Sequence, residues 1–430
     1  MRLLYIVIDG VGDLPIPELA GKTPLEAAET PNLDRLAEKG KLGLMYTVRE
    51  GVAPESDVAV ISILGYDPFT YYTGRGPLEA VGSNINFEDG DLALRCNFAT
   101  ADMNNKIIDR RVGRNLTTGE AEELSRTINS EVKLESVPSS FEFKSTIGHR
   151  AVLVIRKKGK GRLSGNITNT DPAYTRVGSL GSAEPEPETN LKMSKPMDET
   201  YEAKISAELL NEFTKKTRIL LEDHPINLKR QSEGKLKANV ILSRDAGSEL
   251  PKLFNINRKY NLKFASIVEM PVERGISMLA GMSMIEIPPT GDLKHDSRIK
   301  AEKILQNIDH YDIFYIHLKG PDEPAHDGDY VSKKRTIEII DSYFLGGILP
   351  NLSLQDTVIC VTADHSTPCK LRRHTSDPVP LLVSGGRIKP DGLVKFSERE
   401  CARGSLKIIS EGSKLMPMLV SMLGKFLKKG

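Results

Sequence analysis

Each of three apolar runs, at residues 3–8, 313–317 and 358–362, ends in side chains that can bind a metal ion. These side chains are Asp9, Asp322, His326, Asp364, His365 and His374. If the runs are neighbouring parallel strands, their carboxyl ends meet at one edge of a sheet and gather the ligands there. Carboxylate and imidazole donors suit Mn²⁺, Zn²⁺, Mg²⁺ or Co²⁺. Because six ligands exceed what one tetrahedral ion needs, we expect two divalent ions about 4 Å apart, an arrangement that supports phosphoryl transfer.

Each of these residues also has an ordinary structural explanation when it is taken alone. Asp9 can form a turn after a strand, and an isolated His326 or His374 can be a surface or hydrogen-bonded histidine. Three strand ends that all carry metal ligands are much harder to explain in this way. The set, rather than any one member, predicts a binuclear metal centre.

Ser56 is the candidate nucleophile. It lies between Glu55 and Asp57 where a helix with apolar positions at 58–64 is expected to begin. The amides and dipole of a helix N-terminus stabilise an anion, either an alkoxide or a bound phosphate. The alternative is a serine that only caps the helix. No GxSxG motif is present, so a metal ion rather than a His–Asp pair is the expected activator of this hydroxyl.

The elements that position these residues alternate between buried strands and helices, which predicts an α/β fold with a mostly parallel sheet. The alternation is clear at both ends of the chain and resumes with apolar runs such as 239–242 and 380–383. Between them the chain is richer in Arg and Lys, with short strands and polar turns. We therefore expect a discontinuous metal-binding catalytic domain, residues 1–85 plus 238–430, and an inserted α+β domain, residues 86–237.

Composition narrows the class of protein. The 430 residues are 39% hydrophobic and 27% charged, with a net charge of +1, as in ordinary soluble globular proteins. No global charge attracts nucleic acid or an anionic membrane. The apolar run at 3–8 is too short for a signal sequence or a membrane span, and the four cysteines lack a CxxC motif, so a cytoplasmic location is expected. The oligomeric state stays open, with a homo-oligomer among the options.

Several motifs together resemble one family, the archaeal-type cofactor-independent (2,3-bisphosphoglycerate-independent) phosphoglycerate mutases of the alkaline phosphatase superfamily. The motifs are IDGVGD at 8–13, TPNLDRLAEKG at 30–40, the Ser56 segment, DRRVGR at 109–114, GHRA at 148–151, SRDAG at 243–247, HLKGPDEPAHDGD at 317–329 and TADHSTPC at 362–369. The resemblance covers nearly the whole chain. It implies an alkaline-phosphatase-like sheet flanked by helices, with the inserted domain acting as a substrate-binding lid.

The resemblance also implies an activity, the interconversion of 3-phosphoglycerate and 2-phosphoglycerate in glycolysis and gluconeogenesis. Ser56 would become a phosphoserine, with no need for bisphosphoglycerate. One metal ion would be held by Asp9, Ser56, Asp364 and His365, and the other by Asp322, His326 and His374. The lid would exclude water while the glycerate re-orients, because a phosphoserine open to water would be hydrolysed.

Arginine and lysine side chains are the expected ligands of the substrate's phosphate and carboxylate, since guanidinium groups bind planar oxyanions bidentately. The candidates are Arg111, Arg114, Arg150 and Arg244, with Lys319 beside the second metal ion. His149 and Asp171 are candidates for acid–base work on the glycerate hydroxyls. An arginine in a basic insert can equally be a solvated surface residue. Asn169 and Ala173 depart from the family pattern, which leaves another phosphorylated substrate open.

Two other functions fit the same residues. The first is a metal-dependent phosphomonoesterase of the same superfamily, which would release phosphate. The second is a protein that binds a phosphorylated metabolite without catalysis, against which the complete ligand set argues.

Overall fold

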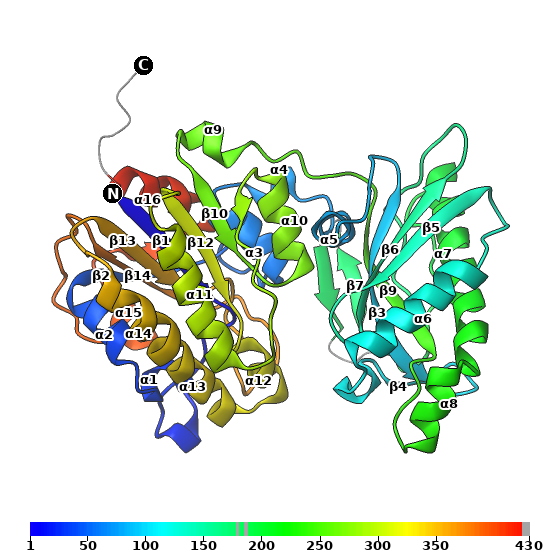
Figure 1. Ribbon diagram of the computed structural model, residues 1–430, viewed down its shortest axis with the longest axis horizontal. Coiled ribbons are helices and arrows are strands. Elements are labelled where there is room, and N and C mark those ends of the chain that lie inside the picture. The colour runs from blue at the N-terminus through cyan, green and yellow to red at the C-terminus, as the bar shows by residue number, and fades with distance from the viewer. Residues whose placement is uncertain (178–179, 185–187, 424–430) are drawn as a thin grey trace. The chain divides into compact units, whose positions relative to one another are not determined.

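The structure, a computed structural model, describes residues 1–177, 180–184 and 188–423 (Figure 1). The chain divides into two compact units. The first unit consists of Met1–Tyr71, Lys252–Glu269 and Ile276–Gly430, and the second of Tyr72–Pro251 and Met270–Gly275. The second unit overlaps residues 86–237, the range expected for an inserted domain, and extends beyond that range at both ends.

The first unit is built on an eight-stranded sheet with the order β11-β10-β12-β1-β13-β14-β2-β15. The strands are β1 (Arg2–Ile8), β2 (Gly40–Met45), β10 (Phe264–Ile267), β11 (Ser283–Met284), β12 (Ile313–Leu318), β13 (Thr357–Thr362), β14 (Val379–Gly385) and β15 (Lys407–Ile409). All neighbours are parallel except that β14 runs antiparallel to both β13 and β2. The prediction of a mostly parallel α/β sheet is thus confirmed. Strand β14 is reversed because residues 363–378 contain no crossover helix, and a parallel return needs one.

Strand β1 lies at the centre of this sheet, between β12 and β13. Residues 3–8 are completely buried, which explains their continuous apolar run. In the parallel register Val7 lies beside His317 on one side and Thr362 on the other. The three carboxyl ends therefore lie at the same edge of the sheet.

Helices cover this sheet in Figure 1. They are α1 (Pro24–Ala27), α2 (Pro31–Glu38), α3 (Ser56–Ile63), α4 (Pro68–Tyr71), α9 (Ile256–Tyr260), α11 (Leu293–Asn307), α12 (Asp322–Asp327), α13 (Tyr330–Ile339), a π-helical turn (Ile340–Leu345), α14 (Gly346–Ile348), α15 (Glu398–Cys401) and α16 (Leu415–Met422). Helix α10 (Pro271–Leu279) contributes residues to both units. Among the described residues, no helix combines the length and apolar character needed to cross a membrane.

The second unit has an antiparallel sheet with the order β4-β3-β6-β5, and β9 pairs with β3. Its strands are β3 (Leu92–Ala101), β4 (Ile107–Asp109), β5 (Ser139–Ser145), β6 (Arg150–Lys157) and β9 (Val240–Gly247), with a separate hairpin of β7 (Tyr174–Val177) and β8 (Leu180–Ala183). Its helices are α5 (Arg75–Gly82), α6 (Thr118–Glu131), α7 (Tyr201–Glu222) and α8 (Pro225–Ser232). The apolar run at 239–242, expected to resume the parallel sheet, belongs instead to β9, because it pairs with β3 and packs under α7.

Lys333 on α13 ties together two of the loops that follow the central strands. Its Nζ lies 2.9 Å from Asp13 Oδ2 and donates to the carbonyl oxygens of Gly12 and Thr367 at 3.1 and 2.9 Å. The Lys333 and Asp13 side chains are 0% and 1% exposed. The pair therefore holds the loop after β1 against the loop after β13.

We expect Lys333→Met to lower the free energy of unfolding by about 3–5 kcal/mol, because Asp13 would be left charged and buried without its cation. Circular dichroism during urea unfolding measures this change, since the chain contains no tryptophan. The control is Lys334→Met on the same helix, which removes a partly exposed pair with Glu338 and should cost less than about 1 kcal/mol. Equal effects of the two substitutions would contradict the assignment.

Candidate active site

Side chains from four segments of the first unit converge at the carboxyl edge of the central strands. Asp9 follows β1, Asp364 and His365 follow β13, and His374 lies further along the same loop. Asp322 and His326 lie on α12, which follows β12, and Ser56 is the first residue of α3. The sequence separation of Asp322 and His326 places both on one face of α12. All seven ligands expected from the sequence are brought together here.

One group of these side chains surrounds the Nε2 atom of His365. That atom lies 3.2 Å from Ser56 Oγ, 3.4 Å from Asp9 Oδ1 and 3.2 Å from Asp364 Oδ2. His365 is 1% exposed and Asp364 is completely buried. A hydroxyl, an imidazole and two carboxylates thus face one small volume that is shielded from water.

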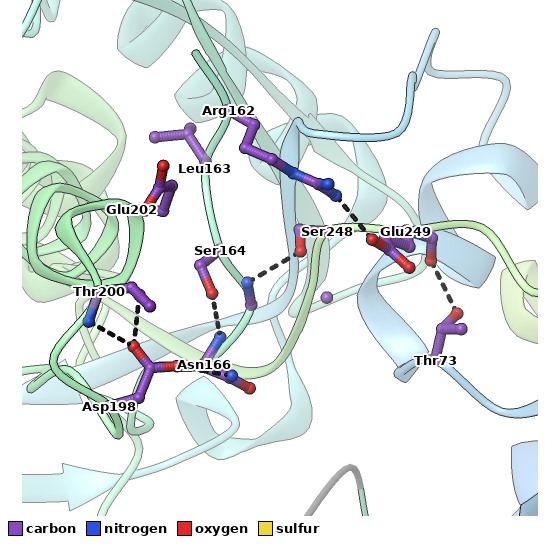
Figure 2. A pocket seen from close by; sticks show the side chains of 12 residues that line it. Thr73, Arg162, Leu163, Ser164, Asn166, Asp198, Thr200, Glu202, Ser248 and Glu249 are labelled. Atoms are coloured by element: carbon purple, nitrogen blue, oxygen red, sulfur yellow. Dashed lines mark hydrogen bonds and ion pairs between the residues drawn. The ribbon is translucent and has the colours of Figure 1, made fainter.

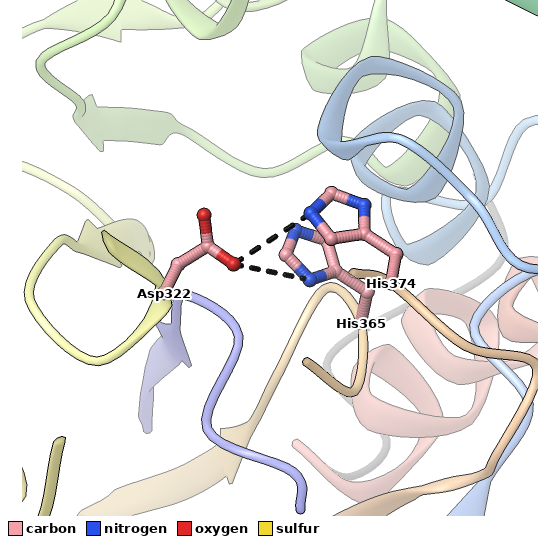
Figure 3. Close-up of side chains that lie close together, drawn as sticks. All are labelled: Asp322, His365 and His374. Atoms are coloured by element: carbon pink, nitrogen blue, oxygen red, sulfur yellow. Dashed lines mark ion pairs between the residues drawn. The ribbon is translucent and has the colours of Figure 1, made fainter. Parts of the chain in front are cut away.

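A second group surrounds the carboxylate of Asp322, which Figure 3 shows facing His365 and His374. Asp322 Oδ2 lies 3.5 Å from His326 Nε2, and Asp322 Oδ1 lies 3.6 Å from His374 Nε2. The two Nε2 atoms are 3.2 Å apart. The His365 and His374 rings stack at 3.6 Å between centroids, so the two groups adjoin.

Backbone carbonyls fix the protonation of two histidines. The Nδ1 of His326 lies 2.9 Å from the Arg372 oxygen, and the Nδ1 of His374 lies 2.9 Å from the Pro54 oxygen. A carbonyl only accepts, so each Nδ1 carries a hydrogen, and each Nε2 is the ring nitrogen that faces Asp322 and its surroundings. Histidines that bind metal ions are oriented by their second nitrogen in this way.

Thr367 determines in the same way which nitrogen of His365 carries a hydrogen. The Thr367 hydroxyl donates to Asp322 Oδ1 at 2.8 Å, which uses its only hydrogen. It therefore accepts from His365 Nδ1, 2.9 Å away, and His365 Nε2 is the nitrogen that faces Ser56 and Asp9. All three histidines thus turn Nε2 toward the two carboxylate groups.

The carboxylates of the first group fit a divalent cation. Asp9 Oδ1 and Asp364 Oδ2 are buried and accept no hydrogen bond from the described residues. Burial and the neighbouring charge of Asp364 raise the pKa of Asp9 to about 6. The other Asp9 oxygen, Oδ2, pairs with Lys319 Nζ at 2.8 Å. A bound cation would compensate the remaining buried oxygens, which otherwise carry a large desolvation penalty.

Two details of this region differ from the sequence-based expectation. Lys319, expected beside Asp322, lies against Asp9 in the first group. His317, interpreted only as part of a strand, joins Asp9 and Asp364 in a cluster whose ligand atoms all lie within 4.8 Å of one another. The position of His317 near the end of β12 is the sequence feature that could have identified it as a candidate ligand.

Ser56 does not serve as the helix cap. Glu55 occupies the N-cap position of α3 and Ser56 is the first helical residue. The Ser56 hydroxyl instead lies beside His365 Nε2, as given above. The capping alternative therefore does not account for this serine.

Three of the predicted arginines of the second unit, Arg111, Arg114 and Arg150, lie close enough to His149 to influence its charge. Burial, followed by the charges of Arg150, Arg111 and two further arginines, Arg95 and Arg114, lowers the pKa of His149 to about 3. His149 is therefore a neutral imidazole within a positively charged cluster. Such a cluster is suited to a multiply charged anion.

Asp171 is an ion-pair partner in this unit. It is 1% exposed, and Arg110 donates to its two oxygens at 3.0 and 2.5 Å. The Ala173 amide donates to the same carboxylate at 3.1 Å, and Asn169 Nδ2 donates to the Tyr174 oxygen at 3.1 Å. The two departures from the family pattern therefore border a bidentate pair in which Asp171 orients Arg110, a residue that the sequence did not single out.

Arg244 lies with two buried arginines that the sequence also did not single out. Its guanidinium stacks 3.5 Å above the Tyr174 ring. Burial, then Arg244 and Arg75, lower the pKa of Arg95 to about 10, and Glu79 accepts from Arg75 Nε at 2.7 Å. Arg95 follows the apolar residues 92–94 within β3, and a charged residue at that position is the sequence signal that could have singled it out.

A separate hollow of about 490 Å³ lies in the second unit (Figure 2). None of the predicted site residues line it. Three of its charged groups pair with neighbours: Arg162 with Glu249 at 2.7 Å, and Asp198 with the Asn166 amide at 2.8 Å. These internal pairs leave no evident ligand site there.

Comparison with known proteins gives a consistent result. The family model described as 2,3-bisphosphoglycerate-independent phosphoglycerate mutase matches residues 37–227. A relative of that name from Aeropyrum pernix is 45% identical and covers 98% of this chain and 100% of its own.

Solved structures agree with this match. The PH0037 protein from Pyrococcus horikoshii is 31% identical with a TM-score of 0.78, and covers 100% of this chain and 99% of its own. The cofactor-independent phosphoglycerate mutase from Thermoplasma acidophilum is 32% identical with a TM-score of 0.59, and covers 99% and 100%. The resemblance drawn from the motifs is confirmed: the chain belongs to the family of 2,3-bisphosphoglycerate-independent phosphoglycerate mutases, which are isomerases.

Proposed function

We propose that the enzyme interconverts 3-phosphoglycerate and 2-phosphoglycerate through a phosphoserine at Ser56. The observation that carries this proposal is the position of Ser56 Oγ, 3.2 Å from His365 Nε2 at the N-terminus of α3. The same nitrogen lies 3.4 Å from Asp9 Oδ1 and 3.2 Å from Asp364 Oδ2, two buried oxygens without a hydrogen-bond partner among the described residues, and a cation would compensate them.

The seven converging residues would hold two divalent ions. Asp9, Ser56, Asp364 and His365 form one set, and Asp322, His326 and His374 form the other. The ions, when bound, would supply activation of the serine hydroxyl and neutralisation of phosphoryl oxygens. Mixed nitrogen and oxygen donors favour Mn²⁺, Co²⁺ or Zn²⁺, while Mg²⁺ prefers oxygen ligands.

Side chains of the chain itself would direct the transfer. Ser56 Oγ accepts the phosphoryl group from one hydroxyl of the glycerate and returns it to the other, so no bisphosphoglycerate is required. Lys319, held against Asp9 at 2.8 Å, is a cation available to a phosphate oxygen. The N-terminal amides of α3 favour the negative charge that gathers at Ser56.

The arginine cluster of the second unit supports recognition of a small phosphorylated carboxylate. We assign Arg111, Arg114, Arg150 and Arg244 to the phosphate and carboxylate of the substrate. His149 has a pKa lowered to about 3, so its ring is neutral and forms hydrogen bonds. It cannot act as an imidazolium acid until an anion beside it raises this pKa. Asp171 is proposed to position Arg110 rather than to transfer protons, and the unit as a whole is proposed to keep water from the phosphoserine.

We place this activity in the cytoplasm. Its substrates are soluble metabolites, and all four cysteines are free and buried, as suits a reducing compartment.

Ser56→Ala should reduce turnover of 3-phosphoglycerate by at least about 10³-fold, because no other group replaces the attacking oxygen. The control is Ser62→Ala on the same helix, whose buried hydroxyl has no hydrogen-bond partner among the described residues. The assay follows formation of 2-phosphoglycerate and of free phosphate. Unchanged turnover in Ser56→Ala would contradict the covalent route, and phosphate as the main product would favour a phosphomonoesterase.

Asp322→Asn should lower the metal content from about two ions per chain to about one, since Asp322 is the carboxylate shared by His326 and His374. Elemental analysis after equilibrium dialysis against Mn²⁺ measures the content. Asp327→Asn, an exposed residue of the same helix, is the control and should keep both ions. Two ions bound to Asp322→Asn would contradict the proposal that Asp322, His326 and His374 hold the second ion.

Arg244→Lys should raise KM for 3-phosphoglycerate at least about tenfold, because lysine cannot reproduce a planar bidentate contact or the stack on Tyr174. Steady-state kinetics measure the effect. Arg162→Lys, at an exposed arginine of the same unit, should leave KM unchanged. If Arg244→Lys also left KM unchanged, the arginine cluster would not be the substrate's anion site.

A further inference from the structure

We propose that His317 is an additional ligand of the metal ion held by Asp9 and Asp364, an inference that rests on the two-metal function proposed above. His317 lies inside β12, one residue before the strand ends. Its side chain is completely buried. Its side chain therefore contacts only its neighbours in the protein.

The strand register places His317 on the same face as the two carboxylates. His317 lies beside Val7 in β1, and Val7 lies beside Thr362 in β13. Side chains alternate along a strand, so the residues two positions beyond Val7 and Thr362 share this face. Those residues are Asp9 and Asp364.

The side chains of His317, Asp9 and Asp364 lie close together. His317 Nε2 lies 3.4 Å from Asp364 Oδ2, and the ligand atoms of His317, Asp9 and Asp364 all lie within 4.8 Å of one another. His365 Nε2 lies 3.2 Å from the same Asp364 oxygen. Two imidazole nitrogens therefore approach one carboxylate oxygen at nearly equal distances.

The 3.4 Å between His317 Nε2 and Asp364 Oδ2 matches two ligands of a common ion better than a direct hydrogen bond, and Asp364 Oδ2 accepts no hydrogen bond from the described residues. Metal–ligand bonds of about 2.1 Å at tetrahedral angles put neighbouring ligand atoms about 3.4 Å apart. An N–H···O hydrogen bond normally spans about 2.7–3.2 Å. Asp364 Oδ1 already accepts from the Gly10 and His365 amides, each at 3.1 Å, which leaves Oδ2 as the oxygen that faces both imidazoles.

The other nitrogen of His317 has the kind of partner that metal-binding histidines use. Its Nδ1 lies 3.3 Å from Tyr315 Oη, two residues earlier on the same strand. With Nδ1–H donated to this phenol, Nε2 offers its lone pair to the cluster. The result is a site with two imidazoles, two carboxylates and a serine hydroxyl, which is a donor set for Zn²⁺, Co²⁺ or Mn²⁺ rather than Mg²⁺.

The test counts coordinating histidines directly. The full chain, labelled with ¹⁵N-histidine and loaded with ¹¹³Cd²⁺, is examined by NMR for scalar coupling between cadmium and imidazole nitrogen. Four coupled histidines are expected: His317, His326, His365 and His374. His317→Gln should show three, and His310→Gln, at an exposed histidine of the same unit, should keep four.

Three coupled histidines in the unsubstituted protein, with His317 uncoupled, would overturn this inference and leave the proposed mutase intact. No coupled histidine at all would overturn the two-metal function as well. This count needs no variant, so it decides the question even if His317→Gln does not fold.

Measurement of Zn²⁺ affinity distinguishes a His317 that binds the ion from a His317 that only orients Asp364. We expect His317→Gln to weaken binding at this site more than 100-fold, and Tyr315→Phe, which removes only the partner of Nδ1, to weaken it by about tenfold. Equal losses in the two variants would mean that His317 only orients Asp364, which would overturn the proposal.

Discussion

Negative charge concentrated at one edge of a buried sheet is the constraint on which this structure depends. Asp9 and Asp364 follow adjacent strands whose register is fixed by fully buried apolar residues, so the carboxylates cannot move apart. Their inward oxygens accept no hydrogen bond from the described residues. A bound cation would offset the cost of burying such a pair in a low-dielectric site, and the surrounding histidines turn their Nε2 atoms toward it.

Hydrogen bonds from Lys333 and Thr367 hold the loops that carry these residues. Lys333 joins the loop after β1 to the loop after β13, and Thr367 links His365 to Asp322 in a fixed order of donors and acceptors. The metal centre proposed at this edge would be organised before any ion binds, because its expected ligands are already oriented by backbone or side-chain partners. This preorganisation places Ser56 beside the centre as the first residue of a helix.

Sequence patterns predicted what depends on local chemistry. Apolar runs that end in Asp or His indicated both the central strands and the side chains that gather at their ends, because a buried parallel strand and a polar strand end are each visible in the sequence. The direction of β14 and the membership of β9 were not visible, since an apolar run does not specify its partner strand. His317 was hidden within such a run. The pairing of Asp171 with Arg110 depends on residues that only the folded second unit brings together.

Six side chains and two cations are proposed to surround the Ser56 hydroxyl. Anomalous diffraction at the manganese absorption edge, from crystals grown with Mn²⁺, tests this proposal most directly. The account predicts two peaks about 4 Å apart, one bonded to Ser56 Oγ with Asp9, Asp364 and His365, and the other bonded to Asp322, His326 and His374. A single peak, or peaks that do not contact Ser56, would contradict it.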